Sequence, residues 1–410
     1  MDWNKFFSMI IDILGGHRMK ILMIGARNSG KTTYMASAFG ILQKPHFGFS
    51  VGAINSDDKT WFNNIYTMIR EGGYPDPTDK KSSYAMDLLY SNEKMMSFSW
   101  LDFAGGLIYQ TKNGESALAP ELKSSDGLMV FFDAKALLDH DDEATQLSST
   151  VRLALSELIK REDEYFISIV LTKWDSIPSG KTVRQVIGSD LFTFLETMKL
   201  KPTIKVSVIP VSCVGEFMIN VDYPLLFQLN LGLKIEYDRH MKNYQKLLNE
   251  YHDAENTKKR LEQEAEEYRV KEKAEDDRAA ELKSGGIFHH ASDWVYSRWN
   301  GFKTDKEIAK EHTDKGMEYW RMKRNALELA EAEAKTAESK YKKYGEILEK
   351  YNKTVNADKK LDEYLASYKI ALPPPVSDAT RRNYADKLFS AFHSANTGQL
   401  QASGGGRYDI

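Results

Sequence analysis

Cysteine is almost absent from this sequence: Cys213 is the one such residue in 410. A single cysteine excludes an internal disulfide, and a chain of this length without a disulfide framework is typical of a reducing compartment. We therefore expect a cytoplasmic protein. With 42% hydrophobic residues the chain can bury a sizeable core, and its length predicts more than one domain.

Long apolar runs are also lacking. No stretch reaches the roughly 18 to 20 apolar residues that cross a bilayer, so we expect no transmembrane helix. Residues 1–17 carry apolar side chains at helical intervals, interrupted by Asp12, which predicts a short amphipathic helix and not an export signal. This helix either folds onto the globular body or makes a peripheral contact with a membrane or a partner.

A strong charge of either sign is absent as well. The formal net charge is −3, so no basic field favours nucleic acid, which we do not expect as a partner. The informative residues are therefore local motifs.

The segment 25–33 has the spacing of a phosphate-binding loop, with Gly25, Gly30, Lys31 and Thr32 in the pattern G-x-x-x-x-G-K-[ST]. It follows a predicted strand and opens a predicted helix, so backbone N–H groups and the helix N-terminus are expected to surround phosphates. Lys31 would reach the outer phosphates and Thr32 would ligate magnesium. The expected nucleotide contacts of this loop are Gly25, Asn28, Ser29, Gly30, Lys31, Thr32 and Thr33.

Apolar runs alternate with helical patterns from residue 18 to 234, which predicts an α/β domain with a mostly parallel central sheet. The runs at 83–90 and 94–105 predict an antiparallel edge pair joined by a tight turn. Buried strands are predicted within 127–134, 166–175 and 204–212. Functional groups should follow the carboxyl ends of the parallel strands.

Two further motifs lie at predicted strand ends. In "LDFAGG" Asp102 could hold magnesium through water, and the N–H of Gly105 could meet the terminal phosphate. In "TKWD", which includes Thr172, the carboxylate of Asp175 could accept both the ring N–H and the exocyclic amine of guanine. Lys173 would pack along the base.

The backbone at Ser212 and Cys213 would then meet the guanine carbonyl, and Cys213 is otherwise a small buried residue. With the phosphate loop these motifs predict GTP or GDP, with Mg²⁺, as the bound cofactor.

The ordered set "GARNSGKT", "DFAG", "TKWD" and "VSC" resembles that of the translation-factor-related P-loop GTPases, the class of Ras-like and Arf-like proteins, over residues 18–234. The resemblance implies a P-loop GTPase fold and GTP hydrolysis, slow or on activation. It also implies a switch-one threonine that binds magnesium. Thr78 is our choice, because Thr60 and Thr67 lie in helical sequence. Family members place a glutamine where this chain has Gly106, so the usual water-orienting residue is missing.

The missing glutamine directs attention to Arg27 and Asn28 in the phosphate loop. Asn28 matches the position at which potassium-activated GTPases carry an asparagine. K⁺, or Arg27 acting within the chain, could supply the charge stabilisation that an arginine finger gives elsewhere. The alternative is that both side chains only point to solvent. The expected catalytic set is Lys31, Asn28, Arg27 and Thr78.

Residues 235–372 change character: two charged segments with apolar residues at three- and four-residue steps predict a long antiparallel α-helical coiled-coil hairpin. The second helix is longer, so its end should return to the globular domain. The tip loop 284–303 contains an aromatic cluster, which indicates a contact with a protein partner or a membrane, or a self-packed tip. Residues 373–410 predict a short helix after three prolines and a flexible tail.

These features together predict a molecular switch that carries its nucleotide state through a helical arm to a protein partner. Two alternatives stay open at this point: a structural assembly component, homo- or hetero-oligomeric, with bound GTP and little turnover, and a dynamin-like GTPase at a membrane.

Overall fold

The computed structural model describes residues 18–75, 82–103, 111–112, 115–116, 118–159, 161–214, 217–284, 294, 297, 301 and 303–370. These residues divide into two compact units. One contains the described residues up to Tyr237 and from Lys353 onward, and the other is Asp238–Asn352. The predicted helix 1–17, Thr78, Gly105, most of the tip loop and the segment 373–410 lie outside the described residues.

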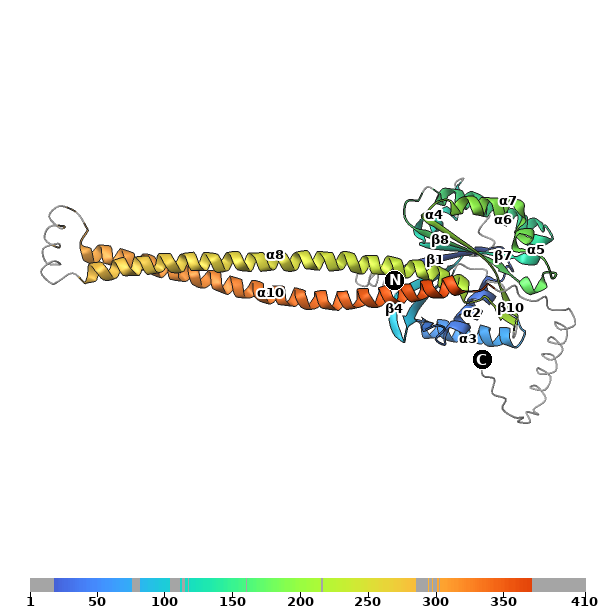
Figure 1. The fold of residues 1–410 in the computed structure, drawn as a ribbon, viewed down its shortest axis with the longest axis horizontal. Coiled ribbons are helices and arrows are strands. Elements are labelled where there is room, and N and C mark those ends of the chain that lie inside the picture. The colour runs from blue at the N-terminus through green and yellow to red at the C-terminus, as the bar shows by residue number, and fades with distance from the viewer. Residues whose placement is uncertain are drawn as a thin grey trace, which may run out of the picture. The chain divides into compact units, whose positions relative to one another are not determined.

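The first unit is built on a seven-stranded sheet in the order β2-β3-β4-β1-β7-β8-β9 (Figure 1). Strands β4, β1, β7, β8 and β9 are parallel, whereas β3 runs antiparallel to both of its neighbours, β4 and β2, which confirms the mostly parallel α/β fold. The strands are β1 Met19–Gly25, β2 Phe49–Ala53, β3 Ser82–Tyr90, β4 Glu93–Asp102, β7 Gly127–Asp133, β8 Tyr165–Thr172 and β9 Ile204–Pro210.

The edge of the sheet differs from the prediction. The β3–β4 hairpin is present, and its turn is tight because Ser91 and Asn92 both adopt positive φ, of 51° and 66°. The predicted edge pair is nevertheless not at the edge, because the unpredicted strand β2 pairs with β3. Two strand pairs too short to predict, β5 (Thr111–Lys112) with β6 (Glu115–Ser116) and β10 (Ser212–Val214) with β11 (Phe217–Ile219), lie outside this sheet.

Helices cover both faces of the sheet (Figure 1). The helical sequence expected around Thr60 and Thr67 is confirmed as α3, and the Asn55 side chain caps this helix by accepting from the N–H of Asp57. A capping box between Thr182 and Gln185 begins α7. The helices of this domain are α2 Lys31–Leu42, α3 Ser56–Arg70, α4 Ala119–Ser124, α5 Ala134–Leu138, α6 Asp142–Leu158 and α7 Val183–Lys199.

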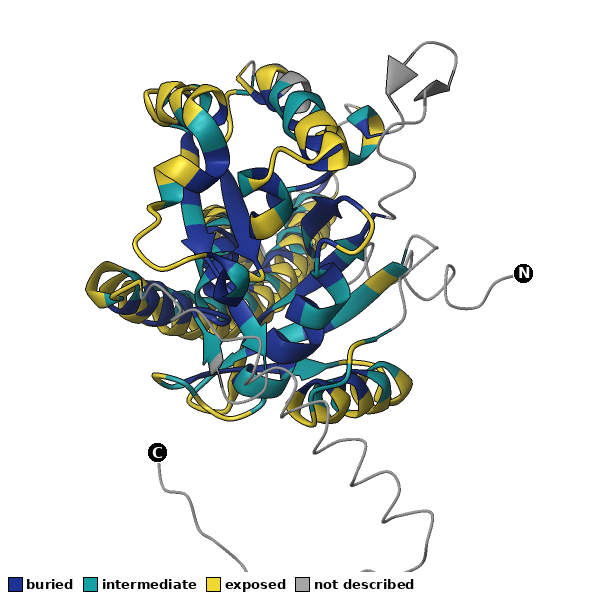
Figure 2. Cartoon of the chain, turned by 90° about the vertical axis from the view of Figure 1, so that its right-hand side faces the viewer, coloured by how far each residue is buried: buried dark blue, intermediate teal, exposed yellow. Residues whose placement is uncertain are grey.

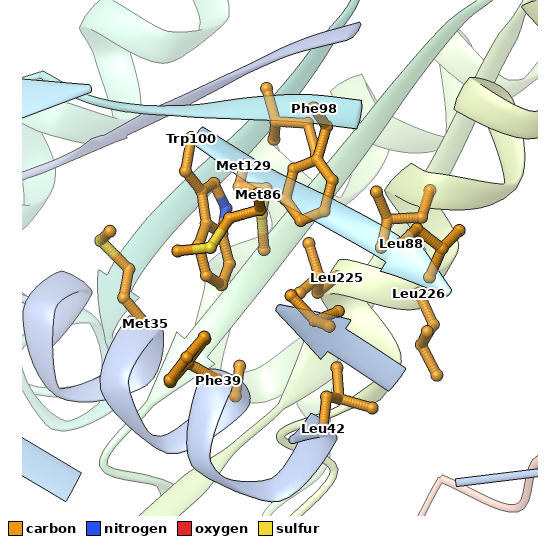
Figure 3. Packing of buried hydrophobic residues seen from close by; sticks show 14 of the residues in the cluster. Met35, Phe39, Leu42, Met86, Leu88, Phe98, Trp100, Met129, Leu225 and Leu226 are labelled. Atoms are coloured by element: carbon orange, nitrogen blue, oxygen red, sulfur yellow. The ribbon is translucent and has the colours of Figure 1, made fainter. Parts of the chain in front are cut away.

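Two apolar clusters fill the space between the sheet and its helices. Figure 2 shows the central strands largely in dark blue and the outward faces of the helices largely in yellow. On one face α4 to α7 pack against β1, β7 and β8. On the other face the sheet packs against α2 and α3, together with the start of α8 (Tyr223–Lys283) and the end of α10 (Asp305–Ser367). Figure 3 shows part of this second cluster, with the labelled residues Met35, Phe39, Leu42, Met86, Leu88, Phe98, Trp100, Met129, Leu225 and Leu226.

Helix α8, Tyr223–Lys283, begins inside this domain and continues unbroken into the second unit. The sequence pattern suggests a separate helix before 236, but the structure shows one helix. Gln228 is completely buried in it, and its amide Nε2 lies 3.0 Å from the Leu128 carbonyl and 3.2 Å from the Phe166 carbonyl. The first turns of α8 are thereby joined to β7 and β8.

The end of helix α10, Asp305–Ser367, also belongs to the first unit. Ala357 and Leu361 are completely buried in the α2-side cluster. Asn230 Nδ2 of α8 donates to Asp358 Oδ1 at 3.1 Å and to Asp362 Oδ1 at 3.0 Å. The return of the second helix to the domain is thus present from Lys353 onward.

In the second unit, helices α8 and α10 pair in antiparallel order, because contacts that advance along α8 go backward along α10. Tyr244 contacts Tyr344, with ring centroids 4.6 Å apart, and further along α8 Glu272 pairs with Lys323 at 2.5 Å. Glu275 pairs with His312. Small buried side chains permit this close approach: Ala254, Ala265, Ala279, Ala309, Ala326, Ala330 and Ala337. Within the residues that the structure describes, no helix is both long and apolar enough to cross a membrane.

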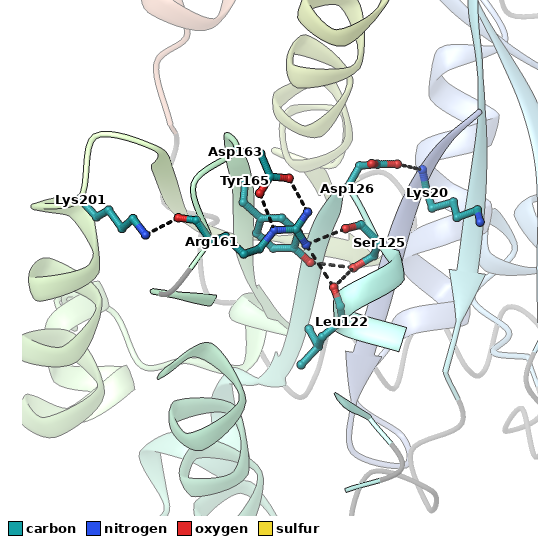
Figure 4. A network of polar contacts seen from close by, with 8 residues as sticks. All are labelled: Lys20, Leu122, Ser125, Asp126, Arg161, Asp163, Tyr165 and Lys201. Atoms are coloured by element: carbon teal, nitrogen blue, oxygen red, sulfur yellow. Dashed lines mark hydrogen bonds and ion pairs between the residues drawn. The ribbon is translucent and has the colours of Figure 1, made fainter. Parts of the chain in front are cut away.

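A polar network ties together the amino ends of the central strands (Figure 4). The Arg161 guanidinium pairs with Asp163 at 2.5 Å and donates to the Ser125 carbonyl at 3.1 Å. The Tyr165 hydroxyl lies 2.8 Å from Ser125 Oγ, and Asp126 accepts from the N–H of Lys20 at 2.7 Å. These contacts fix the starts of β1, β7 and β8, so the opposite, carboxyl edge is the one available for function.

Removing the side chain of Leu361 tests whether the end of α10 is part of the domain core. We expect Leu361→Ala to lower the free energy of unfolding by about 2–5 kcal/mol, because it leaves a cavity in a fully buried cluster. The matched control on the same helix, Leu327→Ala, removes a side chain that is 49% exposed and should change it by about 0.5 kcal/mol or less. Urea unfolding followed by tryptophan fluorescence measures both, and equal losses would contradict the assignment.

Candidate nucleotide site

The carboxyl ends of the parallel strands bring most of the predicted residues to one edge of the sheet. The phosphate loop follows β1, Asp102 ends β4, and Asp133 ends β7. Thr172 ends β8 and Asp175 follows it in a short 3₁₀ turn, Trp174–Ser176. The topology of the fold therefore assembles the loop with the two motifs that the sequence analysis placed at strand ends.

The phosphate loop requires glycine at two positions, Gly25 and Gly30. Gly30, at φ +85°, is the residue before α2, and a Cβ there would meet the side chain of Thr172 at 3.3 Å. A Cβ on Gly25 would lie 2.7 Å from the Phe131 carbonyl oxygen, so only glycine fits. Thr172 Oγ1 in turn lies 2.6 Å from the Ser29 carbonyl, which fixes the loop against β8.

Lys31 is the first residue of α2, and its ammonium group is held inside the loop. Its Nζ donates to the carbonyl oxygens of Gly25, at 2.8 Å, and Ala26, at 3.3 Å. Burial lowers the pKa of Lys31, while the nearby carboxylates of Asp102 and Glu143 act in the opposite direction. A largely buried cation at a helix N-terminus is a favourable place for phosphate.

Asp102 is the buried carboxylate of the site. Its side chain is only 1% exposed, and among the described residues no group donates a hydrogen bond to Oδ1. Burial raises the pKa of Asp102 to about 6, and the charge of Lys31 works against this rise. A buried oxygen without a partner costs stability unless a cation or water meets it, so the residue fits the role of a magnesium-site carboxylate.

The magnesium ligands predicted beside Asp102 are Thr32 and Thr78. Thr32 is the second residue of α2, within the loop, whereas Thr78 lies outside the described residues. Among the residues that are described, no group of three or more His, Cys, Asp or Glu could hold a metal by protein ligands alone. Mg²⁺ commonly binds one or two protein oxygens together with phosphates and water.

The base-recognition motif is present and braced from two sides. Asp175 is 3% exposed, and the Ser212 hydroxyl donates to its Oδ1 at 3.0 Å. Lys173 has φ +54°, and its Nζ pairs with Asp133 Oδ2 at 2.6 Å. The sequence analysis missed Asp133, because a contact between residues 40 positions apart has no local pattern.

Ser212 and Cys213 lie where the motif order predicts, after β9, but in the unpredicted strand β10. The side chain of Ser212 holds Asp175, a role that sequence reasoning assigned to neither residue. Burial raises the pKa of the Cys213 thiol to about 12, so this cysteine stays protonated and serves as a small packing residue.

Arg27 and Asn28 are both exposed. Asn28 adopts φ 63°, a left-handed conformation in which asparagine is enriched, so the backbone alone gives a reason for this residue type. The N–H of Arg27 donates to Glu143 Oε1 at 3.3 Å. Glu143, at the start of α6, is a neighbour of the loop that no sequence motif signals. Gly105 and Gly106 lie outside the described residues.

The strand order, the loop and the strand-end carboxylates define a P-loop GTPase domain, which is a GTP-binding class. Residues 20–213 match the family model described as Double-GTPase 2, which is just under half of the chain. The helical region after it falls outside the match. A search among curated proteins finds no match to this sequence.

Solved structures with partial similarity are GTP-binding proteins. The signal recognition particle receptor SRb-GTP/SRX complex from Chaetomium thermophilum is 16% identical, covers 49% of this chain and 93% of that one, and has a TM-score of 0.32. A GTP-binding protein from Sulfolobus solfataricus in complex with GDP is 18% identical over 51% of each chain, with a TM-score of 0.25. This chain therefore spans about half the length of the Sulfolobus protein. These global scores are low, so the class assignment depends on the domain's topology and site.

The raised pKa of Asp102 makes a testable contribution to stability. The folded-state value of about 6 exceeds the ordinary 3.8, so the folded protein holds the proton more tightly, and stability falls as pH rises from 4 to 6. In the nucleotide-free, magnesium-free protein we expect Asp102→Asn to remove this fall, so that the free energy of unfolding of the variant, relative to wild type, rises by about 3 kcal/mol between pH 4 and pH 7. Thermal unfolding at several pH values measures it; parallel curves for wild type and variant would contradict the assignment.

Proposed function

We propose that this protein is a GTP-dependent molecular switch that hydrolyses GTP to GDP and passes its nucleotide state through the helical arm to a protein partner. The observation that carries the proposal is that two buried carboxylates lie at the same edge of the sheet. Asp102 lies near Lys31 with an oxygen, Oδ1, that accepts no hydrogen bond within the described part of the chain, and Asp175 is held in position by Ser212.

The phosphate end of the site depends on Lys31, Thr32 and Asp102. Lys31 would exchange its contacts with the loop carbonyls for the outer phosphates, and the N-terminus of α2 would add its backbone N–H groups. Thr32 and Asp102 would hold Mg²⁺, which supplies charge neutralisation for the phosphates. Because Lys31 is already buried, its attraction to phosphate is weakly screened by water.

The base end depends on Asp175. Its carboxylate offers two acceptor oxygens, which match the ring N–H and the exocyclic amine that guanine presents side by side. Adenine has no such donor pair. The hydrogen bond from the Ser212 hydroxyl fixes the direction of the Asp175 carboxylate. Lys173, positioned by Asp133, would cover the base.

The hydrolysis step is the part of the proposal that uses Arg27 and Asn28. Gly106 stands where a glutamine commonly orients water, so charge stabilisation must come from elsewhere. Both side chains are exposed at the loop, where Asn28 could help bind K⁺ and Arg27 could approach the terminal phosphate. We propose a slow intrinsic rate that such a cation or a partner raises.

Transmission to a partner is supported by chain continuity. Helix α8 starts within the domain core and α10 ends there, and both continue into the second unit. The arm exposes apolar side chains such as Trp320 and Leu327, which can contact a protein. We propose a cytoplasmic setting for this switch.

Guanine selectivity is tested by Asp175→Asn. The amide replaces one acceptor with a donor, so we expect GTP affinity to fall roughly 1,000-fold while affinity for xanthosine triphosphate, which carries a carbonyl in place of the amine, rises. Asp139→Asn, which changes an exposed aspartate of the same domain, is the matched control. Calorimetric titration measures all four affinities. If Asp175→Asn bound GTP like the control, Asp175 would not read the base.

The cation proposal is tested by measuring hydrolysis in KCl and in NaCl at equal ionic strength. We expect roughly 10-fold faster turnover in K⁺, lost in Asn28→Ala, because that variant removes the side-chain oxygen. Arg27→Ala tests the alternative source of positive charge in the same assay. Equal rates in the two salts would exclude the monovalent cation, and a rate that falls only in Arg27→Ala would assign the role to arginine.

A further inference from the structure

The end of α10 and the residue just after it, Tyr368, contact Asp222, and Tyr364 also contacts His46 in the turn that follows α2. Tyr364 and Tyr368, one helical turn apart, both donate to the carboxylate of Asp222: Tyr364 to Oδ2 at 2.5 Å and Tyr368 to Oδ1 at 3.0 Å. His46 Nε2 lies 3.2 Å from Asp222 Oδ2 and 3.1 Å from the Tyr364 hydroxyl. We call these four residues the tyrosine latch.

Asp222 stands directly before α8, and its side chain is almost fully buried. Burial would raise its pKa, but the hydrogen bonds from His46, Tyr364 and Tyr368 bring the pKa below its ordinary value. The carboxylate is therefore ionised and fully engaged. It joins the start of one arm helix to the end of the other through hydrogen bonds to charge, which are stronger than neutral ones.

The other side of the latch is a strained turn. His46 and Phe49 exchange backbone hydrogen bonds of 2.7 and 2.9 Å around Phe47 and Gly48, which have φ values of +50° and +85°. Glycine adopts this conformation freely, but a bulky aromatic residue does so only at a cost of about 1 kcal/mol or more. The Phe47 side chain is 66% exposed, and its main aromatic partner is Tyr364, with ring centroids 4.4 Å apart.

A single helix, α2, connects the phosphate loop to this turn. Helix α2 carries Lys31 and Thr32 in its first turn and ends at Leu42, about 18 Å away and four residues before His46. A small displacement of α2 by a bound phosphate would therefore reach His46 and Phe47. Ala357 and Leu361 are packed in the core, so the part of α10 that can respond is the turn after them.

From this geometry we infer that the tyrosine latch is a nucleotide-linked contact: the end of α10 is held to α2 and α8 more firmly in one nucleotide state than in the other. The inference rests on the proposed function, because it requires that the domain binds both GTP and GDP. It identifies α10, and not only α8, as a route from the site into the arm. Linkage then requires that breaking the latch changes the ratio of the two nucleotide affinities.

The experiment uses the full chain with two variants. Tyr364→Phe with Tyr368→Phe removes both hydroxyl contacts with Asp222 and keeps the rings. Tyr344→Phe is the matched control, because it removes a hydroxyl that contacts Tyr244 in the second unit. Hydrogen exchange of the amides at 362–370 is measured with GDP and with a non-hydrolysable GTP analogue. The affinities for both nucleotides are measured by titration.

We expect wild type and control to show at least 3-fold slower exchange at 362–370 with one nucleotide than with the other. The double variant should lose this difference. Its affinity should fall about 5-fold for the nucleotide that gives the slower exchange in wild type, and little for the other. His46→Ala, which enters the latch from the α2 side, should act in the same direction.

A failure of the latch inference and a failure of the proposed function give different results. If wild type binds both nucleotides but exchange at 362–370 is the same with each, or if the affinity ratio is unchanged in the double variant, the latch inference is wrong and the proposed function stands. If wild type binds neither nucleotide, both are wrong. A double variant that loses affinity for both nucleotides equally would also overturn the inference, because a purely structural role predicts no change in the ratio.

Discussion

The burial of Lys31 and Asp102 at the end of the central strands is the constraint on which the remaining structure depends. Two ionisable groups are withdrawn from water, and one oxygen of the Asp102 carboxylate has no hydrogen-bond partner among the residues that the structure describes. Such an arrangement costs folding free energy, so the rest of the domain must supply it. The well-packed clusters on both faces of the sheet and the closed polar network at the amino ends of the strands supply that stability.

Both arm helices are anchored in the first unit by polar side chains. Gln228 of α8 donates to carbonyl groups of β7 and β8, and Asn230 of α8 donates to Asp358 and Asp362 of α10. Burial raises the pKa of Asp358 to about 6, and the neighbouring Asp362 adds to this rise. The two helices are thus fixed at their domain ends by polar contacts that would be costly to leave unmade. These contacts attach the ends of the two long helices to the domain.

Much of the fold and site could be predicted because the decisive signals are local in sequence. The loop spacing predicted Lys31 at a helix start, and apolar runs that end in Asp102 and TKWD predicted strands with functional ends. The missed features have no such signal. Strand β2 has five residues and is stabilised by pairing with β3, and β10 depends on β11 in the same way. Asp133, Glu143 and His46 act through partners distant in the sequence, which periodicity cannot reveal.

The ion pairs within the hairpin have a consequence for how its two helices can be aligned. Glu272 with Lys323 and Glu275 with His312 lie near the seam, and each carboxylate is less than one-fifth exposed. If α10 shifted by one or two turns along α8, the alanines could still pack, but these carboxylates would lose their partners on the other helix. Misaligned pairings are therefore penalised even where the apolar pattern tolerates them. The alignment of the two helices within the second unit is in this way encoded in a few polar side chains.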